Sequence, residues 1–234
     1  MLRPPRILMI LTSSATMGAG GEPTGLWFEE LATPFTTFVD AGAAVALASI
    51  AGGPAPIDPR SLKPKGENAP SVERFLADAA ASAALAATLP LSDTAAEDYD
   101  AVFLPGGHGT MWDLPRSDAL AGLLGTAWAA GRVVAAVCHG PAGLVRATDG
   151  TGAPLVRGRR VTAFSDSEER AVGLAERVPF LLETRLRDLG ARYERAADFQ
   201  PFVLADGRLV TGQNPASSAL TARLTLDALA EASR

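Results

Sequence analysis

Short β-rich runs alternate with longer segments of helical periodicity along the chain, and this alternation restricts the possible folds more than any other feature. Strands are expected at residues 6–12, 45–50, 101–104, 133–137 and 161–164, and helices at 24–41, 71–85, 117–131 and 180–189. Continuous apolar runs such as residues 133–137 are typical of strands buried on both faces of a parallel sheet. The sequence therefore predicts an α/β fold with a doubly wound, mostly parallel sheet and helices on both faces.

The C-terminal part adds a smaller element. Runs at 202–204 and 209–211 flank Asp206-Gly207, which predicts a β-hairpin. A last helix is expected to follow, with Asn214 as its N-cap and Pro215 in its first turn. No linker-like stretch divides the 234 residues, so one domain is expected over residues 1–234. The Pro-rich loop at 52–64 could shape a pocket mouth or a dimer contact, and both interpretations stay open.

Charge and cysteine content exclude several classes of function. A net charge of −5 without a Lys/Arg cluster argues against nucleic acid or an anionic membrane as the partner. The single cysteine excludes an intrachain disulfide. The N-terminal apolar run has only five residues and follows two prolines, which favours a buried strand over a signal peptide. With no stretch of about 18 apolar residues, we expect a cytoplasmic protein.

The segment most informative about function is the end of the expected strand at 133–137, where Cys138-His139-Gly140-Pro141 follows directly. A strand, a nucleophile and small residues in this order are typical of a nucleophile elbow. A helix beginning at Cys138 would lower the thiol pKa, and N–H groups at the turn could stabilise an oxyanion. A lone cysteine between Val and Ala is usually a buried small hydrophobe. The adjacent histidine and the small residues favour the nucleophile instead.

The elbow resembles that of the ThiJ/PfpI superfamily, which is class I glutamine amidotransferase-like, and in particular its glyoxalase III-like heat-shock chaperone branch. Four further segments resemble landmarks of this branch in the same order: Gly25-Leu-Trp-Phe-Glu-Glu-Leu31, Leu104-Pro-Gly-Gly-His-Gly-Thr-Met-Trp-Asp113, Val178-Pro-Phe-Leu-Leu-Glu183 and Val210-Thr-Gly-Gln-Asn-Pro-Ala-Ser-Ser218. The resemblance covers residues 6 to 230. It implies a flavodoxin-like fold and a homodimer.

Carried over residue by residue, the resemblance implies that Cys138 is the nucleophile, that His139 is a general acid/base and that Glu30 hydrogen-bonds the sulfur. A carboxyl beside a thiolate has a raised pKa and can stay protonated as a donor. Glu29 competes for this role, but its side chain points about 100° away on a helix. Glu30 is preferred because it lies five residues after Gly25, as in the resembling segment.

The remaining site residues are a third acid and the glycine-rich loop. The resemblance places a third catalytic acid after the strand at 161–164, where Glu169 aligns best and Glu168 and Asp166 are rivals. Such an acid would orient the imidazole of His139. In the glycine-rich loop, the N–H of Gly107 is expected to form an oxyanion site with the N–H of His139. His108 is either a wall of the pocket or an exposed loop residue.

No cofactor or metal is expected. The chain has two histidines, His108 and His139, and one of them belongs to the elbow, so we predict no metal site. The glycine-rich loop at 18–23 lacks the dinucleotide fingerprint because Pro23 occupies the third glycine position.

The resemblance implies an enzyme, a lyase of the glyoxalase III type (a hydro-lyase, D-lactate dehydratase-like). It would convert a small reactive aldehyde, methylglyoxal, to lactate without glutathione, through a hemithioacetal on Cys138. The same triad could serve a cysteine hydrolase, whether protein deglycase, amidase or peptidase. A third possibility, of another class, is a redox-sensing stress chaperone in which Cys138 cycles through sulfenic acid. The cysteine alone does not separate these functions.

Overall fold

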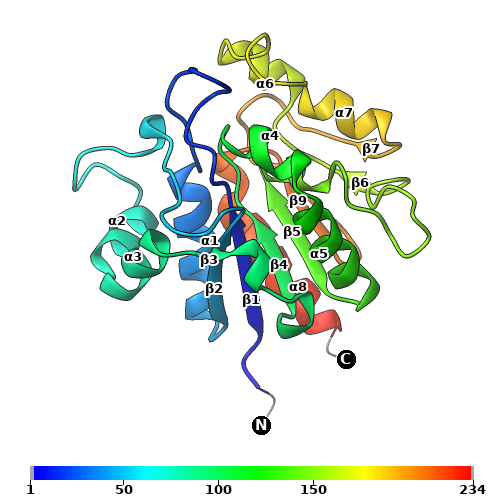
Figure 1. Ribbon diagram of the computed structural model, residues 1–234, viewed down its shortest axis with the longest axis horizontal. Coiled ribbons are helices and arrows are strands. Elements are labelled where there is room, and N and C mark those ends of the chain that lie inside the picture. Colours follow the sequence, from blue (N-terminus) through cyan, green and yellow to red (C-terminus); the bar gives the residue numbers. More distant parts are fainter. Residues whose placement is uncertain (1–2, 233–234) are drawn as a thin grey trace.

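A seven-stranded sheet forms the centre of the computed structural model, which describes residues 3–232 (Figure 1). The strand order is β3-β2-β1-β4-β5-β9-β8, and all neighbours are parallel except the β8–β9 pair. The bounds are β1 Arg6–Leu11, β2 Ala44–Ser49, β3 Leu89–Pro90, β4 Ala101–Leu104, β5 Val133–Val137, β8 Val203–Asp206 and β9 Leu209–Gly212. The predicted doubly wound, mostly parallel sheet is confirmed.

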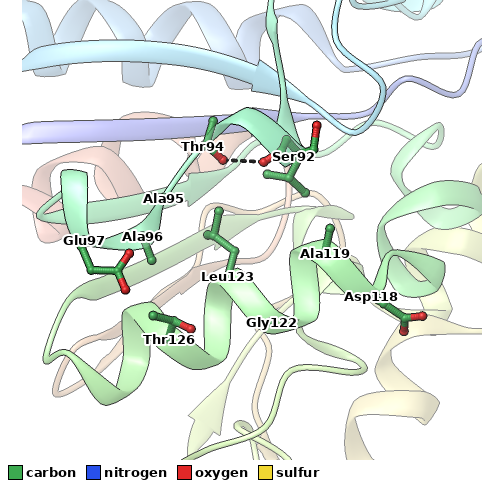
Figure 2. Close-up of a pocket in the computed structure, with 11 residues that line it drawn as sticks. Ser92, Thr94, Ala95, Ala96, Glu97, Asp118, Ala119, Gly122, Leu123 and Thr126 are labelled. Atoms are coloured by element: carbon green, nitrogen blue, oxygen red, sulfur yellow. Dashed lines mark hydrogen bonds between the residues drawn. The ribbon is translucent and has the colours of Figure 1, made fainter.

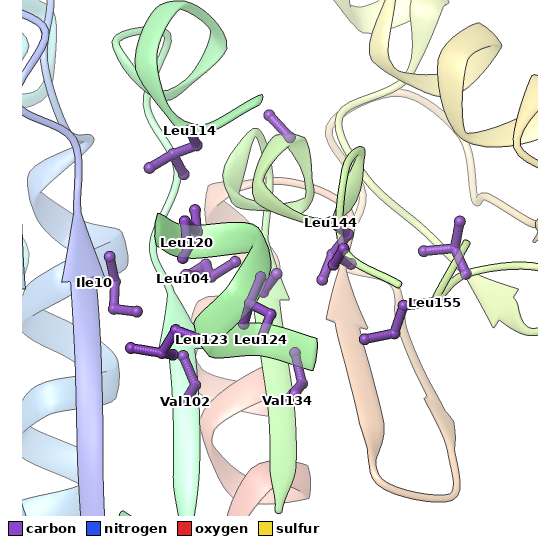
Figure 3. Close-up of a cluster of buried hydrophobic side chains, with 14 of the residues drawn as sticks. Ile10, Val102, Leu104, Leu114, Leu120, Leu123, Leu124, Val134, Leu144 and Leu155 are labelled. Carbon is purple, nitrogen blue, oxygen red and sulfur yellow. The ribbon is translucent and has the colours of Figure 1, made fainter. Parts of the chain in front are cut away.

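Helices cover both faces of this sheet because successive strand residues point to opposite sides. In β1, Ile7 and Met9 belong to one buried cluster and Leu8 and Ile10 to the other. The first cluster packs against α1, α2, α3 and α8, and the second against α5 and α7 (Figures 1 and 3). The helices are α1 Phe28–Asp40, α2 Pro70–Ala77, α3 Ala79–Ala86, α4 Thr110–Asp113, α5 Asp118–Ala129, α6 Asp166–Ala171, α7 Leu182–Asp188 and α8 Ser218–Ala232.

Short 3₁₀ helices join these elements. They are η1 Pro59–Ser61, η2 Leu91–Asp93, η3 Ala96–Asp98, η4 Leu114–Arg116, η5 Gly140–Leu144 and η6 Pro215–Ser217. The predicted start of the last helix is confirmed: Asn214 caps η6, Pro215 is its first residue, and α8 follows directly. Within residues 3–232 no helix is long and apolar enough to cross a membrane.

The predicted hairpin is present, and it extends the main sheet. Residues Asp206 and Leu209 pair across the turn, and Gly207 has a φ of 58°, a left-handed conformation that glycine tolerates. Strand β9 also pairs in parallel with β5, the strand that leads to Cys138. The hairpin therefore supports the strand that carries the proposed nucleophile.

Three predicted elements were wrong in extent. The helix expected at 24–41 begins only at Phe28. The helix expected at 71–85 is two helices, because Asp78 ends α2 and its carboxylate accepts hydrogen bonds from the N–H groups of Ala80 and Ala81 to start α3. The strand expected at 161–164 is only β6, Arg160–Val161, which pairs with β7, Arg192–Tyr193, in a separate two-stranded sheet. Beyond β6 the chain turns to the elbow, where the N–H of Phe164 donates to the carbonyl of Cys138.

Candidate active site

The elbow has the predicted strand-turn geometry. Cys138 follows β5 directly and has a φ of 59°, which is unusual for a residue other than glycine. Its N–H donates to the carbonyl of Gly212 at 2.9 Å, which fixes this conformation from the neighbouring strand. A Cβ on Gly140 would lie 2.1 Å from the carbonyl oxygen of Leu104, so the turn closes only around glycine at this position. Strain held by neighbouring backbone is typical of nucleophile elbows.

The expected lowering of the thiol pKa by a helix was wrong. Helix η5 begins at Gly140, two residues after Cys138, and is a 3₁₀ helix of five residues. The thiol is 3% exposed. Burial raises the pKa of Cys138, and the neighbouring carboxyl of Glu30 raises it further. The resting side chain is therefore a thiol, and its attack on a substrate requires a base that removes the proton.

His139 lies in the right place to act as that base. Its Nδ1 is 3.3 Å from the Sγ of Cys138, and its Nε2 is 2.7 Å from Oε2 of Glu169. Burial opposes ionisation of Glu169, but His139 and hydrogen bonds from both histidines hold the pKa of that carboxyl far below its ordinary value. The carboxylate therefore accepts a hydrogen bond from the Nε2–H of His139, which leaves Nδ1 facing the sulfur. This is the geometry of a nucleophile, a base and an orienting acid.

The two rival acids serve other contacts. Asp166 accepts hydrogen bonds from the hydroxyl and the N–H of Thr184. Glu168 is buried and binds three donors, the N–H of Ser165, the N–H of Phe199 and the side-chain amide of Asn214. Of the three acids considered, Glu169 is the one that contacts His139.

Glu30 lies on the other side of the thiol, as expected. Its side chain has no exposed area, and its Oε2 accepts a hydrogen bond from the N–H of Gly106 at 2.8 Å. Oε1 has no partner of standard hydrogen-bond geometry within residues 3–232, and the thiol of Cys138 is the polar neighbour that acts on its pKa. Burial raises the pKa of Glu30 from an ordinary value of 4.5 to about 8, against the lowering effect of Cys138 and Gly106. Glu30 is thus protonated at neutral pH, whereas Glu29 is partly exposed.

Only glycine at position 106 lets Glu30 lie this close to the glycine-rich loop and the elbow. A Cβ at this position would lie 2.6 Å from Oε2 of Glu30 and 2.6 Å from the backbone nitrogen of His139. The glycine-rich loop is also tied to the start of α1, since the N–H of Trp27 donates to the carbonyl of Gly106. Within residues 3–232, the N–H groups of Gly107 and His139 donate to no backbone carbonyl. The N–H of Gly107 can bind an oxyanion, and the N–H of His139 donates to the sulfur of Cys138 beside it.

His108 is a wall of the pocket, with 6% of its area exposed. Its Nε2 lies 2.8 Å from Oε1 of Glu169, and its Nδ1 lies 3.2 Å from Nη2 of Arg60. A guanidinium only donates hydrogen bonds, so Nδ1 of His108 accepts and its proton is on Nε2. Burial lowers the pKa of His108 to about 4, and the charges of His139 and Arg60 act in the same direction. His108 is therefore neutral and donates to the carboxylate.

The residues of this cluster do not fit a metal ion in their present hydrogen-bond arrangement. His108, His139 and Glu169 offer ligand atoms within 4.8 Å of one another, a proximity that the sequence did not predict. A metal, however, needs the lone pair of a ring nitrogen. Nε2 of His108 carries its proton because Arg60 donates to Nδ1. A metal on Nε2 would require the other tautomer, with the proton on Nδ1. That N–H would point at the guanidinium of Arg60, which has no acceptor.

The site opens into a cavity of about 390 Å³. The lining is mostly apolar and comprises Trp27, Arg60, Gly107, His108, Cys138, His139, Phe164, Val172, Phe199 and Pro215. Sequence reasoning missed Arg60 and the apolar wall. The apolar residues come from segments far apart in the chain, and only Trp27 and Pro215 stand inside segments that the family resemblance singled out. The turn signal of Asp58-Pro59 indicated a loop but not that Arg60 reaches the elbow.

A second depression, of about 330 Å³, lies between the η2–η3 segment and α5 (Figure 2). Its polar groups are the carboxylates of Glu97 and Asp118 and the hydroxyls of Ser92, Thr94 and Thr126, and no cysteine or histidine lines it. The hydroxyl of Thr94 donates to the carbonyl of Leu91, a local turn contact. Cys138 and His139 therefore lie outside this depression and line the pocket at the elbow.

Comparison with known proteins agrees with this geometry. A model of the DJ-1/PfpI family matches residues 28–227. The chain belongs to the DJ-1/PfpI family. It is 34% identical over 236 residues to the glutathione-independent glyoxalase HSP31 of Saccharomyces cerevisiae, covering 97% of this chain and 99% of that protein. The solved structure of glyoxalase III from Candida albicans is 32% identical, with a TM-score of 0.86 over 96% of this chain and 97% of that one.

A further solved structure carries a name that states no reaction. The Rapid Encystment Protein of Francisella tularensis is 36% identical, with a TM-score of 0.91 over 96% of this chain and 99% of that one. The predicted family resemblance and fold are thus confirmed over nearly the whole chain.

Proposed function

We propose that this DJ-1/PfpI protein is a glutathione-independent glyoxalase that converts methylglyoxal and water to lactate, with Cys138 as nucleophile. The observation that carries the proposal is the hydrogen-bonded chain from Glu169 through His139 to Cys138, with the protonated carboxyl of Glu30 beside the thiol. The names of relatives such as the Saccharomyces cerevisiae and Candida albicans proteins support an enzyme of this kind. The apolar lining suits an aldehyde with a methyl ketone.

In the first step the thiol proton passes to Nδ1 of His139 and the sulfur attacks the aldehyde carbon. A C–S bond forms, the C=O π bond breaks, and the resulting oxyanion lies within reach of the N–H groups of Gly107 and His139. Protonation of that oxygen by the imidazolium completes a hemithioacetal. No redox cofactor is needed, because the substrate itself holds both the group to be oxidised and the group to be reduced.

In the second step a proton moves between the two carbons of the adduct. His139 removes the proton from the former aldehyde carbon, and the electron pair shifts to give an enediolate. Glu30, which is protonated, assists by donating to the developing oxyanion. Return of the proton to the neighbouring carbon leaves that carbon as an alcohol and the first as a thioester.

In the last step water hydrolyses the thioester. His139 activates the water, the C–S bond breaks, and the thiol of Cys138 is restored as lactate leaves. The sum is one methylglyoxal plus one water to one lactate. The reaction that we propose is that of a lyase of the glyoxalase III type. The alternative function is a hydrolase that uses the same triad.

The raised pKa of the thiol argues against the redox-sensor hypothesis. A peroxide sensor needs a cysteine with a depressed pKa, and burial raises the pKa of Cys138. The cytoplasmic location, the homodimer and the single domain inferred from the sequence remain predictions.

Lactate formation from methylglyoxal without glutathione tests the proposal. We expect turnover by the native protein and none by Cys138→Ala. Asp166→Asn is the control variant, because Asp166 lies in the segment of Glu169 but contacts Thr184 and not His139. It should form lactate at close to the native rate. A folded native protein that forms no lactate but releases ammonia from amides, or amines from glycated peptides, would overturn the proposal in favour of the hydrolase.

A further inference from the structure

Arg60 is held rigidly at the wall of the pocket. Its Nε and Nη2 donate to the carboxylate of Asp58 at 2.9 and 2.6 Å. That carboxylate is fully buried and also accepts the hydroxyl of Thr24 and the backbone N–H of Arg60 itself. The segment is tied to the start of α1, because the N–H of Asp58 donates to the carbonyl of Leu26. A guanidinium held by two parallel bonds has little freedom to leave.

The same Nη2 donates to Nδ1 of His108 at 3.2 Å. This contact favours one tautomer of His108, the one that also donates to the carboxylate of Glu169. Nε2 of His108 must be the protonated nitrogen, and it donates to Oε1 of Glu169 at 2.8 Å. Oε2 then accepts from Nε2 of His139 at 2.7 Å, which leaves Nδ1 of His139 to face the thiol at 3.3 Å.

We propose that Arg60 is a positioning residue that sets the tautomer of His108 and, through Glu169, keeps Nδ1 of His139 free to take the proton of Cys138. The proposal deepens the proposed function, on which its kinetic part rests. Without the donor at Nδ1, the ring of His108 could carry its proton there. Its bare Nε2 would then face the carboxylate, and Glu169 would lose one of its two fixed donors.

No other charged group takes this place within residues 3–232. The groups that face His108 are Arg60 at Nδ1, Glu169 at Nε2, and the rings of His139 and Phe164, whose centroids lie 4.1 and 6.1 Å from its own. The aromatic ring offers no donor to Nδ1, and the ring nitrogens of His139 are committed to Glu169 and Cys138. The tautomer of His108 is thus set from two sides, by the guanidinium of Arg60 at Nδ1 and by the carboxylate of Glu169 at Nε2.

The first test reads the protons directly. The chain has two histidines, so long-range ¹H–¹⁵N NMR spectra of the ¹⁵N-histidine-labelled protein contain two rings. We expect His108 as the Nε2–H tautomer in the native protein, and a change toward Nδ1–H or the doubly protonated ring in Arg60→Leu. A native His108 that carries its proton on Nδ1 would overturn the proposal without any variant.

The second test measures the thiol. Because Cys138 is the only cysteine, its alkylation by iodoacetamide reports how readily His139 takes the proton. Alkylation and kcat for methylglyoxal should both fall about tenfold in Arg60→Leu, the lower end for loss of an outer hydrogen-bond partner, with a smaller change in KM. Arg60→Lys, which retains a cation and a donor near Asp58, should restore part of the rate.

Arg74→Gln is the matched control, since Arg74 also pairs with a carboxylate through two hydrogen bonds, those to Asp40, and lies away from the pocket. It should leave both rates unchanged. If Arg60→Leu also leaves the His108 signals and the alkylation rate unchanged, the proposal is wrong. If the NMR and alkylation results hold but no lactate forms, the positioning role stands and the glyoxalase reaction fails.

Discussion

Replacement of Glu30 by glutamine gives the most quantitative test of the site. The side chain has no exposed area, and burial raises its pKa from 4.5 to about 8. Each pH unit between these values is worth about 1.4 kcal/mol. Holding the carboxyl protonated in the folded protein therefore changes the free energy of unfolding by about 5 kcal/mol across the whole window.

The sign follows from where the proton is bound. Between pH 4.5 and about 8 the folded protein keeps the proton on Glu30 and the unfolded chain loses it. Stability contributed by this group is fully present below pH 4.5 and is lost as the pH rises to about 8. Glutamine mimics the protonated carboxyl and does not titrate, so Glu30→Gln removes this slope.

The assay is urea unfolding of the native protein and of Glu30→Gln at several pH values. From pH 5 to pH 8 the native protein should lose about 4 kcal/mol relative to the variant. The pKa shifts of other groups affect both proteins equally, so they cancel when the two free energies of unfolding are subtracted. The raised pKa of Cys138 changes the stability only above pH 9.0, its ordinary pKa. Parallel stability curves for the two proteins would refute the buried, protonated Glu30.

Three further outcomes are expected. Glu169→Gln should lower kcat roughly 10²–10⁴-fold, the range for loss of oriented acid–base catalysis, while Asp166→Asn keeps a kcat close to the native value. Equal rates of lactate formation by these two variants would contradict the assignment of Glu169 as the acid. The pH profile of kcat/KM should fall above about pH 8 as Glu30 loses its proton, and a profile that rises steadily through pH 9 would exclude Glu30 as a donor. Leu124→Ala, in the buried cluster of Figure 3, should lower the free energy of unfolding in urea by about 2–5 kcal/mol. Leu220→Ala, at an exposed position, should lower it by less than about 0.5 kcal/mol.

Local patterns predicted the sheet and the elbow well because these depend on neighbouring residues. The apolar run of β5, the small Gly140 and the Asp206-Gly207 turn each specify a local conformation, and each appears as expected. The break at Asp78 was not predicted because the alanine-rich residues around it favour a helix throughout. An aspartate in such a sequence can either continue one helix or act as the N-cap of a second one.

The site was harder to predict wherever it depends on contacts between distant segments. Glu169 and Glu168 are adjacent in the chain, and only the tertiary fold directs one to His139 and the other to Asn214. Arg60 reaches His108 across 48 positions, from a Pro-rich loop for which pocket mouth and dimer contact were both open. The thiol pKa was mispredicted for the same reason, since burial depends on everything packed around Cys138.

Covalent catalysis by Cys138 is the central claim, and intact-protein mass spectrometry during turnover tests it most directly. Samples quenched within the first turnovers with methylglyoxal should show one adduct of the mass of methylglyoxal, mapped to Cys138. The adduct should accumulate in Glu169→Gln, where proton transfer is slow, and be absent in Cys138→Ala. Lactate formation by Cys138→Ala at the native rate, with no adduct on the native protein, would contradict the account.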